Sequence, residues 1–325
     1  MEKLSIVVPM YNEEDNVDRF YKAVKPVMES MSKDYEHEIL FIDDGSRDKT
    51  LKRLKALAQK DEAVKVIVFG RNFGQTPAMS AGIDNASGDV IITMDGDLQN
   101  DPRDIPAMLK MMREQDLDVV SGWRYDRHDP GISKKLPSKL SNKIARYITE
   151  LPLHDFGCSL KLYRKEALAD VRLYGEMHRY IPALVNWNGF KVGEMKVAHH
   201  ARKFGKTKYG LKRLMRGFLD LLAIKFWNKF ATRPLHFFGG WGILFFGAGF
   251  LIGAVKLGLR IAYIFNEDWG QRLEAGPLLL FSVMLMIMGI QLFMFGFLGD
   301  MMIRTYYSQG RNRIYKIRSI VTKRK

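Results

Sequence analysis

Three acidic clusters follow apolar, β-rich runs of the sequence, and one of them could hold a metal ion against phosphate. The best defined is Asp95-Gly96-Asp97, where two carboxylates flank one glycine directly after DVIITM. Carboxylate oxygens suit Mg²⁺ or Mn²⁺, and these ions commonly bridge a protein to substrate phosphates. The other clusters are Glu13-Glu14, after LSIVVP and a short polar stretch, and Asp43-Asp44, after HEILFI. The residues therefore predict a divalent-ion site for a phosphorylated ligand.

Five apolar runs alternate with helical stretches over the first 200 residues, which predicts a soluble α/β domain. The runs are LSIVVP, HEILFIDD, VKVIVFG, DVIITMDGD and LDVVSG, and helices are expected at residues 16–31 and 50–59. This alternation predicts a parallel sheet covered on both faces, with the ligand at the carboxyl ends of the strands. No GxGxxG follows the first run and no GxxxxGKS/T occurs. A dinucleotide-binding Rossmann domain therefore loses its main support, and a P-loop is excluded.

Two later segments are apolar enough to cross a membrane. Residues 235–255 and 277–299 contain no Lys, Arg, Asp or Glu. About 20 apolar residues cover the hydrocarbon core of a bilayer. A pair of buried core helices is the alternative, but soluble helices rarely contain such long apolar runs. We therefore expect a transmembrane hairpin over residues 234–303, with spans at about 235–259 and 277–300.

Positive charge gathers on the outer sides of these two segments. The chain has a formal net charge of +15, and its basic residues are concentrated in residues 201–233 and 304–325. In the linker, residues 266–276, Arg272 is the single basic residue. By the positive-inside rule, both flanks and both termini are expected in the cytoplasm and the linker outside. A nucleic-acid binder could carry similar patches, but the apolar segments between them point to a membrane instead, so no nucleic-acid partner is expected.

Four parts are expected along the chain. Residues 1–210 form the cytoplasmic catalytic domain, and residues 211–233 form a basic amphipathic helix suited to the lipid headgroup layer. An ordinary half-buried helix is the alternative for that second part. The hairpin follows, and residues 304–325 form a basic cytoplasmic tail. Cys158 is the single cysteine, which excludes a disulfide framework and suits a reducing compartment.

Several motifs resemble those of a known enzyme family. VVPMYNEE, FIDDGSRDKT, RNFGQTPAMSAGIDNASGD and TMDGDLQNDP resemble the inverting family 2 glycosyltransferases of GT-A fold. Gly122-Trp123-Arg124, Asp155-Phe156-Gly157-Cys158 and RKFGKTKY, from Arg202, are similar to motifs of the polyprenyl-phosphate glycosyltransferases related to dolichol-phosphate mannose synthase. The two-span hairpin resembles bacterial members that glucosylate undecaprenyl phosphate. The resemblance implies an α/β GT-A domain with a mostly parallel sheet, an interface helix and a transmembrane hairpin.

The same resemblance implies roles on the donor side of the site. The residues implied to bind the donor nucleotide are Pro9, Tyr11, Glu13, Asp43, Asp44, Arg71 and Asp95. Among them, Asp44 is implied to read the base, with Asp43 as its supporting neighbour. The metal and diphosphate site is implied to consist of Asp95, Asp97 and Gln99, with Mg²⁺ or Mn²⁺ as the cofactor.

On the acceptor side, cations are implied to bind the lipid phosphate. These residues are Arg124, Lys135, Ser138, Arg202 and Lys208. Lys135 departs from relatives, which often have an arginine three positions before the serine, so a forked contact there is in doubt. A membrane-surface patch is the alternative for the lysines of this loop. Asp155 matches a residue proposed as the catalytic base in relatives. A role in positioning another group is an equally favoured alternative for Asp155. Catalysis is expected to depend on Asp155 and Asp97.

The implied reaction transfers one sugar from a UDP-sugar to undecaprenyl phosphate at the cytoplasmic face of the inner (plasma) membrane. The product would donate sugar to lipopolysaccharide, cell-wall or other surface glycans. Glucose from UDP-glucose is favoured, which implies a polyprenyl-phosphate β-glucosyltransferase; mannose from GDP-mannose, N-acetylglucosamine and 4-deoxy-4-formamido-arabinose stay open. A processive synthase is disfavoured because QxxRW and further spans are absent. A membrane-tethered nucleotide-binding scaffold is the non-catalytic alternative. Relatives imply a homotetramer.

Overall fold

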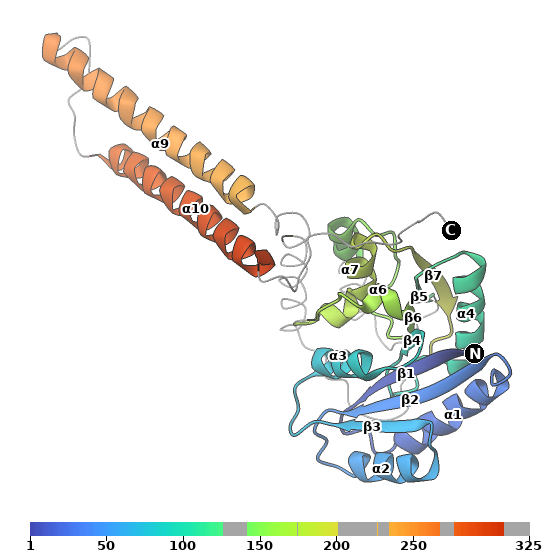
Figure 1. The fold of residues 1–325 in the computed structure, drawn as a ribbon. Helices are drawn as coiled ribbons and strands as arrows, with labels where there is room; N and C mark the ends of the chain where they lie inside the picture. Colours follow the sequence, from blue (N-terminus) through green and yellow to red (C-terminus); the bar gives the residue numbers. More distant parts are fainter. Residues whose placement is uncertain (126–141, 174, 201–225, 227–233, 267–275, 309–325) are drawn as a thin grey trace. The chain divides into compact units, whose positions relative to one another are not determined.

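A seven-stranded mixed sheet forms the centre of the first of two units in the computed structural model (Figure 1). The units are residues 1–223 and 224–325. The structure describes residues 1–125, 142–173, 175–200, 226, 234–266 and 276–308, with the side chains of 303, 304 and 306–308 excepted. The expected interface helix, apart from Phe226, and the tail beyond residue 308 lie outside the described residues.

The strands follow the order β3-β2-β1-β4-β6-β5-β7 across the sheet. Six strands run in one direction, and β6 is antiparallel to both of its neighbours, β4 and β5. The carboxyl ends of β1, β2, β4 and β5 therefore lie along one edge, as the sequence predicts. The strands are β1 (Glu2–Met10), β2 (Tyr35–Asp43), β3 (Val64–Val68), β4 (Val90–Thr93), β5 (Val119–Arg124), β6 (Lys161–Arg164) and β7 (Val192–Val197).

Helices cover both faces of this sheet, because its central strands are apolar on both sides. Along β1, Leu4, Ile6 and Val8 pack into one core with α1, α2 and α4, whereas Val7 joins a second core with α3, α6 and α7. Figure 1 shows these two groups on opposite faces. The helices are α1 (Val17–Ser30), α2 (Thr50–Lys60), α3 (Gln75–Asn85), η1 (Pro102–Asp104), α4 (Ile105–Glu114), α6 (Lys165–Leu168), η2 (Met177–Arg179) and α7 (Ile181–Trp187).

Two long apolar helices make up the described part of the second unit. They are α9 (Pro234–Phe265) and α10 (Pro277–Ser308), and both are long and apolar enough to cross a membrane. Only 11% of the most apolar window of each helix is buried, and large side chains such as Trp241, Leu251 and Phe295 are exposed. A buried pair of core helices would not leave such residues uncovered, so the exposed surface is the one that a bilayer would cover.

Glycines let α9 and α10 approach each other closely. A Cβ placed on Gly242 would lie 2.7 Å from the Gly289 carbonyl oxygen, and one on Gly289 would lie 2.6 Å from that of Gly242. Gly249 meets the Ser282 carbonyl oxygen at 2.5 Å in the same way. Small residues at such contacts allow backbone packing between membrane helices. By contrast, a Cβ on Gly247 of α9 would meet nothing within 4 Å.

We expect Gly242→Leu to weaken the hairpin, because the added side chain would have to displace the α10 backbone. Overpacking of this kind costs about 1–3 kcal/mol. The midpoint of thermal unfolding of the full chain in detergent should fall, whereas the matched Gly247→Leu variant should unfold like the unsubstituted chain. Equal midpoints for the two variants would contradict the observed packing.

Candidate active site

The Asp95-Gly96-Asp97 loop lies directly after β4 at the carboxyl edge of the sheet. The Asp95 backbone N–H donates to Ser159 Oγ at 3.2 Å, and its Oδ1 accepts from Gln75 Nε2 at 2.8 Å. Asp97 Oδ1 accepts from the Gln99 backbone N–H at 3.1 Å. A Cβ on Gly96 would force the end of the Met10 side chain to shift, so this loop packs closely on β1.

Asp95, Asp97 and Gln99 fit a divalent ion that is shared with a substrate. Both carboxylates are only partly buried, and they supply the hard oxygens that Mg²⁺ and Mn²⁺ prefer. Among the described residues, no group of three or more His, Cys, Asp or Glu side chains could hold a metal by itself. An ion here would therefore complete its shell with oxygens from a ligand, as expected for a phosphate-bridging site.

The loops after β1 and β2 are tied together beside this loop. The Arg47 N–H donates to Asn12 Oδ1 at 2.8 Å, and the Glu13 N–H donates to Thr50 Oγ1 at 2.8 Å. Glu13 Oε2 also accepts from Asn16 Nδ2 at 2.6 Å. Pro9 lies in β1 beside Ile42, and Tyr11 follows the strand half-buried. The structure thus brings the first two predicted donor motifs to one edge.

Asp44 accepts hydrogen bonds from a neighbouring loop, which its position in the sequence did not indicate. Its carboxylate accepts from Asn72 Nδ2 and from the N–H groups of Phe73 and Gly74, at 2.7–2.9 Å. These bonds hold the RNFG segment, in which Arg71 lies exposed with its guanidinium 4.4 Å from the Phe73 ring centroid. The neighbouring Asp43 is buried, and its Oδ1 accepts no hydrogen bond from the described residues. Asp44 therefore also shapes the loop that carries Arg71.

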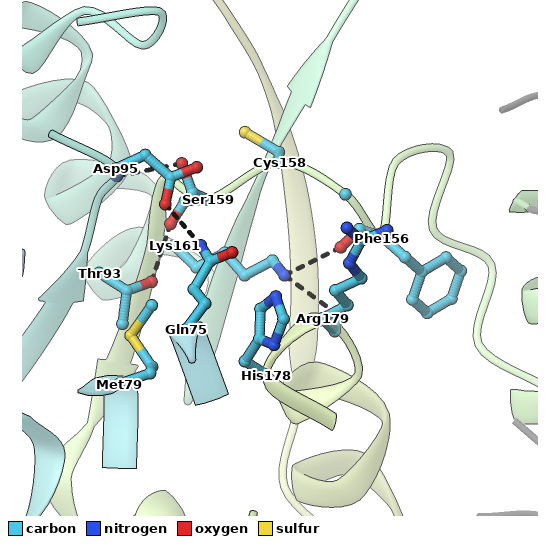
Figure 2. A pocket seen from close by; sticks show the side chains of 11 residues that line it. Gln75, Met79, Thr93, Asp95, Phe156, Cys158, Ser159, Lys161, His178 and Arg179 are labelled. Atoms are coloured by element: carbon cyan, nitrogen blue, oxygen red, sulfur yellow. Dashed lines mark hydrogen bonds between the residues drawn. The ribbon is translucent and has the colours of Figure 1, made fainter. Parts of the chain in front are cut away.

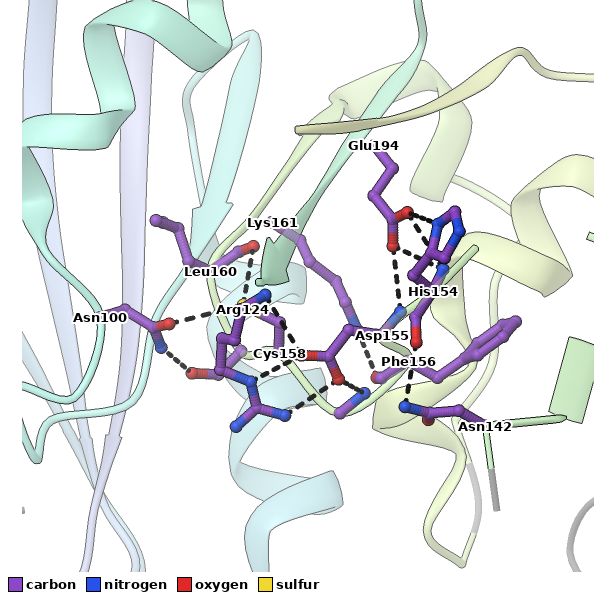
Figure 3. Close-up of polar contacts among 12 residues, drawn as sticks. Asn100, Arg124, Asn142, His154, Asp155, Phe156, Cys158, Leu160, Lys161 and Glu194 are labelled. Atoms are coloured by element: carbon purple, nitrogen blue, oxygen red, sulfur yellow. Dashed lines mark hydrogen bonds and ion pairs between the residues drawn. The ribbon is translucent and has the colours of Figure 1, made fainter. Parts of the chain in front are cut away.

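Arg124 and Asp155 form a forked ion pair at the end of β5 (Figure 3). Arg124 Nε donates to Asp155 Oδ2 at 2.7 Å, and its Nη2 donates to Oδ1 at 3.0 Å. The Gly157 N–H also donates to Oδ1, at 3.0 Å. The two side chains are only 14% and 5% exposed. These contacts orient the Arg124 guanidinium, an arrangement that suits a positioning role for Asp155.

Glu194 on β7 fixes the segment that carries Asp155, and the sequence motifs did not reveal it. Its carboxylate accepts from the backbone N–H groups of His154 and Asp155 at 2.8–3.0 Å and lies 2.7 Å from His154 Nδ1 (Figure 3). The His154 ring also stacks on Trp123, with centroids 4.1 Å apart. Glu194 lies in a strand that no apolar run predicted, so no local signal pointed to it.

A pocket opens between Asp95 and the segment after Asp155 (Figure 2). Its walls include Gln75 from the start of α3, Lys161 from β6, and His178 and Arg179 from η2. A groove of about 620 Å³ is lined in part by Asp97, Arg19 and Arg103. The Asp95-Gly96-Asp97 loop therefore borders two cavities.

The predicted acceptor site extends beyond the part of the chain that the structure describes. Lys135, Ser138, Arg202 and Lys208 all lie outside the described residues. Of the acceptor cations, the structure places Arg124 alone, beside Asp155. The two predicted catalytic acids, Asp97 and Asp155, both lie in the first unit.

Comparison with known proteins identifies the family. A family model described as Glycosyl transferase family 2 matches residues 5–172. The chain is 42% identical over 324 residues to a dodecaprenyl-phosphate galacturonate synthase of Rhizobium johnstonii, covering 98% of this chain and 93% of that protein. It is 34% identical over 307 residues to an undecaprenyl-phosphate 4-deoxy-4-formamido-L-arabinose transferase of Pseudomonas paraeruginosa, covering 94% and 86%.

A solved structure with a similar fold is glucosyl-3-phosphoglycerate synthase from Mycobacterium tuberculosis in complex with Mn²⁺, UDP and glucosyl-3-phosphoglycerate. It superposes with a TM-score of 0.54 at 15% identity, covering 70% of this chain and 80% of that one. This likeness confirms the expected GT-A fold. With a matching family model and relatives that align along almost all of the sequence, the chain belongs to glycosyltransferase family 2.

Proposed function

We propose that this protein transfers one sugar from a nucleotide-sugar donor to a polyprenyl phosphate, with inversion at the anomeric carbon. The observation that carries the proposal is the presence in one unit of a two-carboxylate loop suited to a phosphate-bound ion and of a buried, forked Arg124–Asp155 pair. The comparisons support it, because two relatives aligned along almost the whole chain are named as a dodecaprenyl-phosphate galacturonate synthase and an undecaprenyl-phosphate 4-deoxy-4-formamido-L-arabinose transferase.

The proposed displacement places different demands on the two sides of the site. A lipid phosphate oxygen forms the new bond to the anomeric carbon, while the bond from that carbon to the donor diphosphate breaks and the nucleoside diphosphate leaves. A divalent ion held by Asp95, Asp97 and Gln99 would stabilise the charge of the leaving diphosphate. The phosphate nucleophile is already ionised near neutral pH, so the reaction needs no strong base. Asp155 instead orients Arg124 toward the lipid phosphate. The same phosphate is proposed to be bound by Lys135, Ser138, Arg202 and Lys208.

The donor pocket is proposed to bind a UDP-sugar. The residues assigned to the nucleotide are Pro9, Tyr11, Glu13, Asp43, Asp44, Arg71 and Asp95. Glucose, which the motifs favoured, finds no support in the relatives described above, whose names specify galacturonate and 4-deoxy-4-formamido-L-arabinose. The Mycobacterium synthase that shares the fold is described with Mn²⁺ and UDP, which supports a divalent cofactor and a uridine nucleotide.

The reaction can be tested directly with membranes that contain the protein. Membranes are incubated with undecaprenyl phosphate and a panel of labelled UDP-sugars, and the lipids are then extracted. We expect label in an acid-labile polyprenyl phosphate sugar when Mg²⁺ or Mn²⁺ is present, and we expect excess EDTA to abolish it. Membranes with Asp97→Asn protein serve as the matched control. Label that enters no lipid with any donor would refute the proposed transfer, and full activity in EDTA would refute the ion.

The catalytic domain and both termini are proposed to lie on the cytoplasmic side of the inner membrane, with α9 and α10 crossing it. The support is the apolar surface of the two helices and the lack of basic residues, apart from Arg272, in the linker between them. A homotetramer is proposed from the resemblance alone.

A labelling experiment can decide this orientation. Cysteines introduced one at a time in residues 267–275 should react with a membrane-impermeant maleimide in intact cells, whereas cysteines in the tail after Arg304 should react only after lysis. The native Cys158 gives a low background because it is buried, and burial raises the pKa of its thiol to about 12. Labelling of the tail in intact cells would overturn the proposed orientation.

A further inference from the structure

Lys161 is a buried cation at the wall of the pocket beside Asp95. Its residue is 2% exposed, and its Nζ donates to the backbone carbonyls of Phe156 at 3.1 Å and Arg179 at 3.2 Å. Figure 2 shows the side chain extending from β6 toward Phe156 and Arg179, with Asp95 on the other side of the pocket. An ammonium group has three N–H donors, so one remains for a ligand.

The charge of Lys161 is not balanced by an acid within reach. Among the described residues, no carboxylate lies within hydrogen-bond or ion-pair distance of its Nζ, since both of its acceptors are neutral carbonyls. Burial lowers its pKa to about 8, which leaves it charged at neutral pH. A buried charge without a partner is costly, and that cost falls when an anion binds beside it.

A second cation borders the same pocket. Arg179 lines it, is 27% exposed, and its Nε lies 3.8 Å from Glu176 Oε2. His178, next to it, also borders the pocket and is held by Thr76 Oγ1 at 2.6 Å from its Nδ1. Across the pocket, Asp95 would be neutralised by a bound ion. The pocket wall formed by β6 and η2 therefore carries two cationic side chains, Lys161 and Arg179.

We propose that Lys161 and Arg179 bind the carboxylate of a hexuronic acid, so that the donor sugar is a uronate and not a neutral hexose. This inference rests on the proposed function, which puts the donor diphosphate at Asp95 and Asp97. The diphosphate is attached to the anomeric carbon, and the C6 carboxylate lies across the ring oxygen from it. A sugar between the two walls would thus direct its second negative group toward the cations and away from the ion site.

The test compares two donors that differ only at C6. Binding of UDP-galacturonate and UDP-galactose to the full chain in detergent with Mn²⁺ is measured by calorimetry, without acceptor, and transfer to undecaprenyl phosphate is measured separately. We expect the unsubstituted protein to bind the uronate more tightly. Arg179→Gln and Lys161→Met should each weaken uronate binding by about 10- to 150-fold, the range of a lost charge-assisted contact. Binding of UDP-galactose should change by less than about threefold.

Controls separate recognition of the carboxylate from other roles. Lys165→Met removes an exposed lysine just after β6 and should leave both affinities unchanged. UDP binding reports whether each variant is folded, and Arg179→Lys should restore part of the preference for the uronate. If Lys161→Met fails to bind UDP, the result with Arg179→Gln alone decides whether the pocket recognises the carboxylate.

Two results would overturn the inference. One is equal or tighter binding of UDP-galactose by the unsubstituted protein. The other is a parallel loss of both donors in Arg179→Gln, which would assign the cations to the diphosphate. Failure of the proposed function is a different result, in which the uronate preference is present in binding but no sugar reaches the lipid.

Discussion

Asp97→Asn should lower kcat by at least roughly 10²-fold, the loss seen when one strong electrostatic stabiliser of a transition state is removed. The asparagine keeps the size of the side chain, and its amide oxygen can still accept from the Gln99 N–H as Asp97 Oδ1 does at 3.1 Å. What disappears is one negative charge next to the ion. The loop should therefore keep its shape, and the variant should unfold at the same temperature as the unsubstituted chain.

The measurement is kcat at saturating donor and acceptor over a range of Mn²⁺ concentrations. If Asp97 binds the ion, the Mn²⁺ concentration for half-maximal activity should also rise. Asp84→Asn is the matched control, because it removes an exposed acid from α3 and should behave like the unsubstituted protein. A kcat within about threefold of normal, with an unchanged metal requirement, would exclude Asp97 from the ion site.

Asp155→Asn is expected to reduce activity by about 10²-fold through its effect on Arg124. Removing one partner of a buried ion pair leaves the other charge uncompensated, at a cost of about 3–5 kcal/mol. Arg124 would then lose the opposite charge and one of the two contacts, at 2.7 and 3.0 Å, that orient its guanidinium, because an amide has a single acceptor oxygen. Arg124→Ala should have a similar effect, and we expect the apparent KM for the lipid acceptor to rise in both variants.

A double-mutant cycle separates this role from base catalysis. If Asp155 acts through Arg124, the double variant should be no slower than the worse single variant, because both remove the same arrangement. The pH dependence of kcat gives a second criterion. If Asp155 is the general base, Asp155→Asn should abolish the fall in kcat at low pH. If Asp155 only positions Arg124, the variant should keep that fall. Additive losses together with a missing acidic limb would show that Asp155 is the base.

The parallel part of the sheet could be predicted because local pattern and tertiary role agree there. β1, β2 and β4 are apolar on both faces and lead directly into acidic turns, so both the strands and the edge they share follow from the residues. β6 could not be predicted in the same way. It is short, contains Lys161 and Arg164, and runs antiparallel between strands that are themselves distant in sequence. Its place depends on the packing of the whole domain.

The site shows the same division. The acids of the Asp95-Gly96-Asp97 loop are neighbours in sequence, so their proximity was evident. The motifs marked both Arg124 and Asp155, but not that they pair with each other, since that depends on how the segment after residue 150 returns to the end of β5. Glu194 adds a third distant segment to the same cluster. Asp44 is a different case, because the resemblance implied a contact to the base but gave no sign that its carboxylate also holds the loop at residues 72–74.

The reversed direction of β6 has a consequence for how the two substrates are kept in register. Because β6 is antiparallel, it begins, and does not end, at the edge where the other strands finish. The chain therefore enters β6 through the site, and within a few residues Asp155 contacts Arg124 while Ser159 contacts the Asp95 backbone. One short stretch of covalent backbone thus sets the spacing between the proposed donor and acceptor sides. Deleting or inserting a residue there would change the distance over which the sugar must pass, even if every contacting side chain were retained.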